Sequence, residues 1–260
     1  MAMEKTNILW SAHDVQTALG ISQHLPPSYG VSCDTRTLKE GDIFIPLVTP
    51  YDDGHRYIEQ ALKKSCSFAL TSEKSFVVLD PRRVVCVPDT WQALEALASW
   101  RFRAIGSQVI GVTGSVGKTS VKKGIHHLLG ARYACYASPA SFNNALGVSL
   151  TQALMPKNTK WSIFELGTNS PGEIASLTSQ VRPHIAVITK IGLAHTQQLK
   201  DTDHIAREKA SILWQGCQTA ILPADDKYAT FLLERAQFLK IPQIITFGRA
   251  SDAHICLLSW

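Results

Sequence analysis

The chain has 260 residues, of which 45% are hydrophobic and 18% are charged, and its formal net charge is +5. This composition supports a buried core in one large or two modest domains, and it excludes a mainly disordered chain. Neither a membrane-spanning helix nor a signal peptide is predicted, because no apolar run reaches about 18 residues and none follows Lys5. The positive charge is spread along the chain, which argues against a nucleic-acid-binding tail and is compatible with an anionic substrate such as a nucleotide.

Six cysteines stand at positions 33, 66, 86, 135, 217 and 256, without a CxxC pair or a Cys/His cluster at zinc-ligand spacing. We interpret them as free thiols in a reducing compartment. The expectation is therefore a soluble, cytoplasmic protein.

Short β-rich runs alternate with helical patterns, which predicts an α/β fold. In the first hundred residues, strands are predicted at 42–48, 68–71 and 84–87, and helices at 55–64 and 91–103. Residues 1–106 are therefore assigned to a small N-terminal α/β domain.

After Gly106 the pattern restarts with an apolar strand at 109–112, a glycine-rich loop and a helix. The expected apolar face of this helix consists of Val121, Ile125, Leu128 and Leu129. Gly130 is expected to end the helix as its C-cap. Further strands are predicted at 161–166, 185–191, 219–223 and 243–247, with helices at 172–181, 204–214 and 228–239. This order predicts a mainly parallel sheet in a second domain, residues 107–260, with ligands at the carboxyl ends of its strands.

The loop that precedes the first helix of this second domain reads GVTGSVGKTS over residues 111–120. Its glycines would let backbone N–H groups converge on phosphate oxygens at a helix N-terminus; a loop of purely structural use is the alternative. Lys118 is expected to reach the β and γ phosphates of ATP, and Thr119 to bind Mg²⁺. Val112 stands where the general GxxxxGK[ST] pattern has its first glycine, and Gly111 comes one residue earlier. The predicted ATP-binding residues are Thr113, Gly114, Ser115, Val116, Gly117, Lys118, Thr119 and Ser120.

Three residues farther along the chain are candidates for the same site. Glu165 ends the apolar run WSIFE, where a carboxylate can hold Mg²⁺ against phosphates; a solvated acid at a strand end is the alternative. His195 follows the run IAVITKIG and could contact metal or phosphate, although an isolated histidine is usually structural. Lys209 shares a helical face with Ile205 and Ile212, where a lysine often lays its stem along apolar surface.

Several ordered segments resemble one known family. The loop in its TGxxGK[ST] form, SFNNALGV at 141–148, ELGTNSPGEI at 165–174, ITKIGLAH at 188–195 and IAREKA at 205–210 resemble the Mur ligase family. DTRT at 34–37, GDIF at 41–44 and DGH at 53–55 resemble the UDP-sugar-binding domain of that family. These segments are most similar to those of the family branch that adds D-alanyl-D-alanine to a UDP-MurNAc-tripeptide.

The resemblance implies a ligase that uses ATP and Mg²⁺ to phosphorylate the terminal carboxylate of a UDP-MurNAc-peptide, and then forms an amide from the acyl phosphate. It implies a UDP-MurNAc-peptide-binding domain over 1–106 and an ATP-binding domain over 107–260. The implied catalytic residues are Lys118, Lys209, which would be carbamylated, and His195. The implied metal contacts are Thr119, Glu165, His195 and Lys209. The implied substrate contacts are Thr35, Arg36, Asn143 and Asn144, although all four could also be ordinary turn residues.

Relatives of this kind continue past the position of Trp260 with the rest of the ATP-binding domain and a C-terminal ligase domain. The chain is therefore expected to be incomplete as a ligase and to need a second chain for the remainder. Two alternatives stay open, namely another Mur or folylpolyglutamate-type ligase, and a non-catalytic remnant or nucleotide-binding module. No nucleic-acid or membrane partner is predicted.

Overall fold

The computed structural model describes residues 8–192 and 201–259. The contacts divide the chain into two compact units. The first unit contains the described residues up to Ile105 together with Ser149–Lys157, and the second contains Gly106–Val148 and the described residues from Asn158 onward. Within the described ranges, no helix is both long enough and apolar enough to span a membrane.

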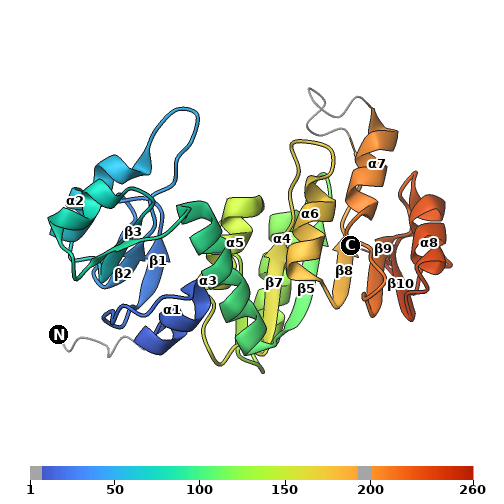
Figure 1. Cartoon of the computed structure of the whole chain (residues 1–260). Helices are drawn as coiled ribbons and strands as arrows, with labels where there is room; N and C mark the ends of the chain where they lie inside the picture. The colour runs from blue at the N-terminus through green and yellow to red at the C-terminus, as the bar shows by residue number, and fades with distance from the viewer. Residues whose placement is uncertain (1–7, 193–200, 260) are drawn as a thin grey trace. The chain divides into compact units, whose positions relative to one another are not determined.

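The first unit is built around a four-stranded parallel sheet in the order β1-β2-β3-β4. Its elements are α1 (Ala12–Leu19), β1 (Gly30–Ser32), β2 (Asp42–Phe44), a 3₁₀ turn (Gly54–Tyr57), α2 (Ile58–Lys63), β3 (Phe68–Thr71), a second 3₁₀ segment (Lys74–Leu79), β4 (Val84–Cys86) and α3 (Thr90–Ile105). α2 packs on β3 (Figure 1). The core between them includes Phe44, Ile58 and Ala69, all of which are buried.

The segment 149–157 belongs to the first unit because of contacts at a buried tryptophan and a half-buried ion pair. The indole N–H of Trp10 donates to the carbonyl oxygen of Ala153 over 3.0 Å. Lys157 pairs with Asp14 of α1 at 2.8 Å. Residues far along the chain therefore complete the N-terminal unit.

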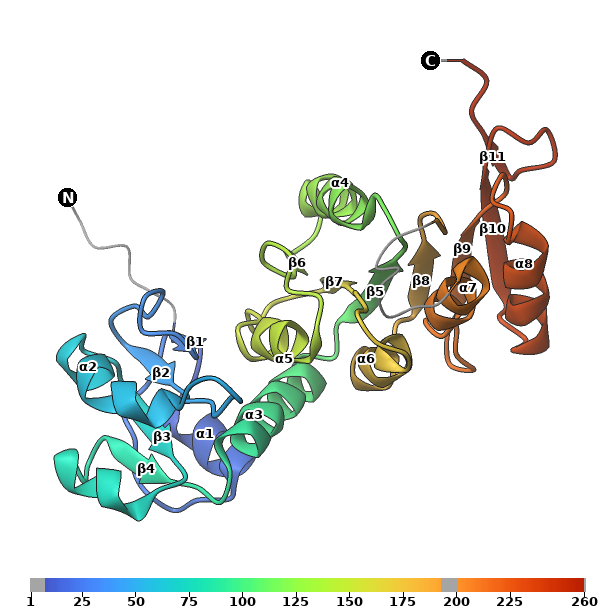
Figure 2. The same cartoon turned by 90° about the horizontal axis from the view of Figure 1, so that it is seen from above.

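The second unit is a seven-stranded parallel sheet in the order β11-β10-β9-β8-β5-β7-β6. Its elements are β5 (Gln108–Thr113), α4 (Lys118–Gly130), β6 (Cys135–Ala137), the start of α5 (Ala145–Ala153), β7 (Trp161–Glu165), α6 (Glu173–Val181), β8 (Ile185–Ile188), α7 (Thr202–Ala210), β9 (Thr219–Pro223), α8 (Ala229–Phe238), β10 (Gln243–Gly248) and β11 (Ile255–Cys256). Figure 2 shows α4 on one face of this sheet and α6, α7 and α8 on the other. The predicted α/β fold with parallel sheets is confirmed.

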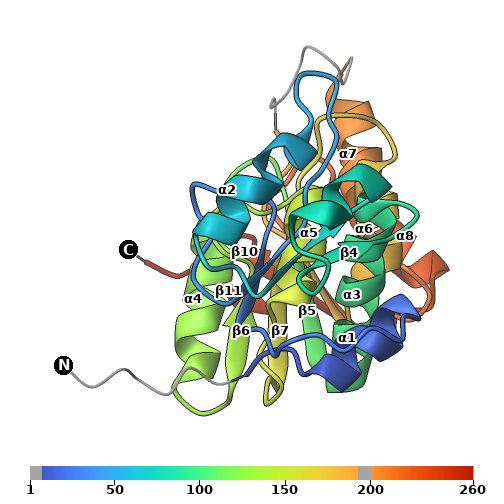
Figure 3. The same ribbon diagram turned by 60° about the vertical axis from the view of Figure 1, so that its left-hand side comes forward.

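α4 lies along β6 and β7 (Figure 3) and covers the sheet with Val121, Ile125 and Leu129. Leu128, predicted on the same face, is 73% exposed, because it lies at the edge of the apolar stripe. The helix ends at Gly130, but its cap residue is Ala131 in a right-handed conformation. The prediction of Gly130 as C-cap is therefore wrong.

Two predicted strands are too long by three or more residues. The strand predicted at 42–48 ends at Phe44, and Pro46 has no N–H to donate to a sheet ladder. The strand predicted at 185–191 ends at Ile188, because the chain then leaves the sheet and crosses the glycine-rich loop. Elements that the sequence did not predict include α1, β1, β6, α5 and β11.

Candidate nucleotide and metal site

The glycine-rich loop runs from the carboxyl end of β5 to the start of α4. Gly114 has φ 151° and Gly117 has φ 83°, values that favour glycine. At Gly114 a Cβ atom would also lie 1.9 Å from the Thr189 hydroxyl oxygen, so no side chain fits there. Gly111 lies within β5, where a Cβ atom would come 3.1 Å from Pro183. Gly111 therefore allows close packing of the strand and is not part of the loop.

Residues after β8 hold this loop in place. The Thr189 hydroxyl donates to the carbonyl oxygen of Val116 over 2.6 Å, and the Ser115 N–H donates to the carbonyl oxygen of Lys190 over 2.7 Å. The Ser115 hydroxyl donates to the carbonyl oxygen of Gly192 over 2.8 Å. The backbone N–H of Ser115, a predicted ATP contact, is therefore hydrogen-bonded within the protein. The N–H groups in the first turn of α4, in contrast, have no acceptor inside the helix.

Three of the predicted site residues meet beside the loop. Lys118 folds back so that its Nζ donates to the carbonyl oxygen of Gly114 over 2.8 Å. The hydroxyl of Thr119 donates to Oε2 of Glu165 over 2.9 Å. Burial lowers the pKa of Lys118, while the nearby Glu165 carboxylate acts in the opposite direction. The cluster brings together the Lys118 ammonium, which can bind phosphate, and the side-chain oxygens of Thr119 and Glu165, which can bind a metal ion. It lies at the edge of the sheet where β5 and β7 end.

A second lysine of α4, which the sequence reasoning missed, contacts the same carboxylate. Lys122 is 2% exposed and lies 3.2 Å from Oε2 of Glu165. Its Nζ also donates to the carbonyl oxygens of Ser138, over 2.9 Å, and of Ala140. Periodicity could not reveal this role, because a lysine next to Val121 in a helix is usually solvated.

Lys209 lies on α7 and is also 2% exposed. Burial, assisted by repulsion from Lys118, lowers its pKa to about 8, and Glu208 acts in the opposite direction. Lys118 and Lys209 are therefore close enough for their charges to interact. Among the described residues, Lys209 forms no ion pair, so its charge is poorly compensated.

Glu208, adjacent to Lys209, fastens α7 to α6. Its two carboxylate oxygens accept the backbone N–H groups of Gly172 and Ile174, each over 2.8 Å. These amides lie at the N-terminus of α6, where a helix favours negative charge. Glu208 lies in the IAREKA segment at 205–210, but nothing in the sequence pattern indicates this contact with α6.

The two predicted substrate-binding asparagines have different surroundings. The side-chain amide of Asn143 donates to Oε1 of Glu165 over 3.1 Å, which places Asn143 at the site. Asn144 accepts the Gly147 N–H over 2.9 Å and so caps the N-terminus of α5. His195 lies outside the described residues.

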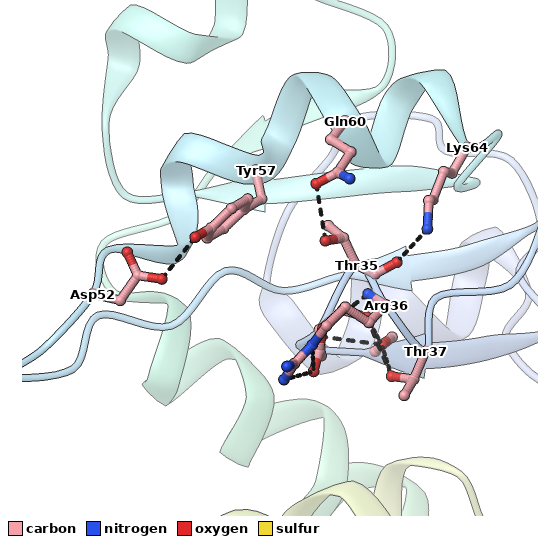
Figure 4. Close-up of polar contacts among 9 residues, drawn as sticks. Thr35, Arg36, Thr37, Asp52, Tyr57, Gln60 and Lys64 are labelled. Atoms are coloured by element: carbon pink, nitrogen blue, oxygen red, sulfur yellow. Dashed lines mark hydrogen bonds and ion pairs between the residues drawn. The ribbon is translucent and has the colours of Figure 1, made fainter.

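In the first unit, the two predicted substrate contacts lie at one turn (Figure 4). The Thr35 hydroxyl donates to Gln60 over 3.0 Å, and its carbonyl oxygen accepts from Lys64 over 2.8 Å. The Arg36 side chain is 86% exposed and pairs with Asp34 at 2.6 Å. Thr35 therefore ties the turn to α2, and Arg36 presents its guanidinium at the surface.

Another cluster in the first unit resembles a metal site only by composition. Asp53, His55 and Glu73 offer ligand atoms that lie within 4.8 Å of one another. However, Nε2 of His55 accepts the Ser72 N–H over 3.0 Å, and Nδ1 lies 2.7 Å from Asp53. With Nε2 an acceptor, Nδ1 carries the proton of a neutral ring, and no lone pair is left for a metal. We therefore assign this cluster a structural role.

Comparison with known proteins adds a family match. The model of the Mur ligase middle domain matches residues 112–257. A UDP-N-acetylmuramoyl-tripeptide--D-alanyl-D-alanine ligase of Bacillus subtilis is 39% identical over 185 residues, which are 71% of this chain and 40% of the relative. The ligase of the same name from Rickettsia prowazekii is 32% identical over 258 residues, which are 96% of this chain and 56% of that relative. The chain thus spans about half the length of these relatives.

Solved structures of MurF proteins also match the chain. MurF from Acinetobacter baumannii superposes with a TM-score of 0.78 at 29% identity, over 94% of this chain and 54% of the other. MurF from Thermotoga maritima in complex with ADP has a TM-score of 0.69 at 23% identity, over 85% of this chain and 51% of the other. The second match supports the fold alone.

Proposed function

The chain belongs to the Mur ligase family, and we propose that it carries the substrate-binding and nucleotide-binding parts of a ligase that joins D-alanyl-D-alanine to UDP-N-acetylmuramoyl-tripeptide. The observation that carries this proposal is the cluster of Lys118, Thr119 and Glu165 at the carboxyl ends of β5 and β7. The names of the relatives support the choice of reaction.

The proposed chemistry turns a poor leaving group into a good one. ATP transfers its γ-phosphoryl group to the terminal carboxylate of the tripeptide, and the incoming amine then displaces phosphate from the acyl phosphate. Lys118 and the amides at the start of α4 bind the phosphates and offset the negative charge that develops during transfer. Catalysis by this part of the chain is therefore positioning and electrostatic stabilisation.

The donor set fits Mg²⁺. Glu165 and Thr119 offer oxygen atoms 2.9 Å apart, and Mg²⁺ prefers oxygen ligands. When bound, the ion supplies positive charge to the phosphate oxygens. His195 remains a proposed contact of metal or phosphate on the resemblance alone.

Lys209 suits carbamylation because its amine is neutral more often than that of an ordinary lysine. With a pKa of about 8, about one side chain in ten is neutral at pH 7, against fewer than about one in a thousand at a pKa of 10.5. The neutral amine forms an N–C bond with carbon dioxide and releases one proton, which leaves a carbamate anion. That anion would join Glu165 as an acidic group near a second Mg²⁺ ion.

The first unit is proposed to bind the UDP part of the substrate. Arg36 has a free surface position and a planar guanidinium that suits a diphosphate, which would then compete with Asp34. We place the protein in the cytoplasm, where nucleotide substrates are present and where its six free cysteines would stay reduced.

Two calorimetric titrations test the proposal. The purified chain is titrated with UDP-N-acetylmuramoyl-tripeptide, and separately with a non-hydrolysable ATP analogue and Mg²⁺. Saturable binding of each is expected, and Arg36→Ala and Lys118→Met should weaken only the first and only the second, respectively. Binding of neither ligand would reject the proposal in favour of a remnant that keeps only the fold.

A further inference from the structure

Lys122 is a buried cation whose partners all lie within the protein. The Lys122 ammonium donates to the carbonyl oxygens of Ser138 and Ala140 and forms an ion pair with Glu165. Its charged end is therefore held by partners within the protein. Contacts through which Lys122 can orient the site are therefore those with these three partners.

Glu165 is the partner through which such an influence would pass. Its side chain is 2% exposed, and burying a carboxylate without a counter-charge costs several kcal/mol. Oε2 accepts from Thr119 and forms an ion pair with Lys122, whereas Oε1 accepts from Asn143. Lys122 supplies the only ion pair of this carboxylate among the residues that the structure describes.

Lys122 also contacts the turn that leads to Asn143, which donates to the other oxygen of Glu165. The turn at Ser138 and Ala140, which Lys122 holds, precedes Asn143 in the chain. Ala140 has φ 42°, a conformation that a non-glycine residue keeps only when its surroundings hold it there. Lys122 is therefore linked to Oε2 directly and to Oε1 through the turn that leads to Asn143.

We propose that Lys122 is a positioning residue that holds Glu165 in the orientation needed to bind Mg²⁺, and so sets how strongly Mg²⁺ increases the affinity for nucleotide. This inference rests on the proposed function, because it takes Glu165 as a metal contact. Groups that orient metal ligands in this way usually change metal affinity 10- to 100-fold when they are removed.

The test is a double-mutant cycle in which the measured quantity is the effect of Mg²⁺ on nucleotide affinity. Wild type, Lys122→Met, Glu165→Gln and the double variant are titrated calorimetrically with a non-hydrolysable ATP analogue, once in Mg²⁺ and once in EDTA. The quantity compared is the ratio of the two affinities. Lys122→Met should reduce this ratio about 10- to 100-fold. The double variant should match Glu165→Gln, because a residue that acts through Glu165 has nothing left to act on.

Two further variants separate positioning from simple loss of structure. Lys122→Arg keeps the charge and should retain most of the Mg²⁺ dependence, whereas Lys122→Gln keeps a donor without the charge and should lose it. These two decide the question if Lys122→Met does not fold, as judged by circular dichroism. An unchanged ratio in folded Lys122→Met, additive effects in the cycle, or equal ratios for the Arg and Gln variants would overturn the inference. Failure of the wild type to bind nucleotide would instead reject the proposed function.

Discussion

Replacing Lys209 by methionine is expected to stabilise the second unit at neutral pH. Burial and the charge of Lys118 lower the pKa of Lys209 from 10.5 to about 8, so the folded state disfavours the protonated side chain. At about 1.4 kcal/mol per pKa unit, this difference corresponds to about 3 kcal/mol of lost stability at pH 7. Methionine has a similar length and no charge, so Lys209→Met should recover up to that amount.

The gain should depend on pH in a defined direction. The unfolded chain keeps the Lys209 proton up to about pH 10.5, whereas the folded chain releases it near pH 8. Between these values the unfolded state binds more protons, so the stability of the wild type rises with pH. The advantage of Lys209→Met should be largest below pH 8 and should disappear toward pH 10.5.

Urea unfolding, followed by circular dichroism at several pH values in carbonate-free buffer without nucleotide, measures this effect. Lys122→Met is the matched control, because Lys122 is equally buried but is paired with Glu165. Its loss leaves a buried carboxylate unpaired and should cost about 3 kcal/mol. The reasoning fails if Lys209→Met is no more stable than the wild type at pH 7, or if its gain is the same at pH 7 and pH 10.

Three other outcomes are expected. Lys118→Met should weaken binding of an ATP analogue about 30-fold by calorimetry, since a hydrogen bond to a charged group contributes about 2 kcal/mol; unchanged affinity would remove Lys118 from the site. Asn144→Ala should lower the free energy of unfolding by about 1 kcal/mol by removing the cap on the Gly147 amide, and Asn144→Asp should restore it. Glu208→Gln should weaken the cap of α6 by about 1 kcal/mol. Because the Glu208 charge raises the pKa of Lys209, the same variant should shift the rise in stability due to Lys209 to lower pH, and an unshifted rise would contradict this.

The sequence was sufficient where one local pattern determines structure. β3 and β9 have the predicted bounds, because an apolar run between polar residues defines a buried parallel strand. The position of Glu165 beside the loop followed from the rule that strand ends in a parallel sheet share one edge. The asparagine before α5 was a readable helix-start signal that the reasoning left unused.

Long-range contacts could not be read from the sequence. Lys122 follows Val121, and one helical step turns it away from the apolar stripe, as for an exposed lysine. It is buried only because the turn that contains Ser138 and Ala140 folds over it. Gly111 lies in a strand, as predicted, but the sequence did not reveal why a glycine stands there, which is the packing of Pro183 against β5.

The charges of the site suggest when Lys209 is most reactive. The Lys122 charge is balanced by Glu165, whereas Lys118 and Lys209 repel one another, and this repulsion helps to lower the pKa of Lys209. Phosphate groups bound beside Lys118 would offset that repulsion and favour the protonated form of Lys209. Under the proposed carbamylation, carbon dioxide should therefore react with Lys209 fastest before nucleotide binds. Once formed, the carbamate anion would attract the cations that enter with the nucleotide.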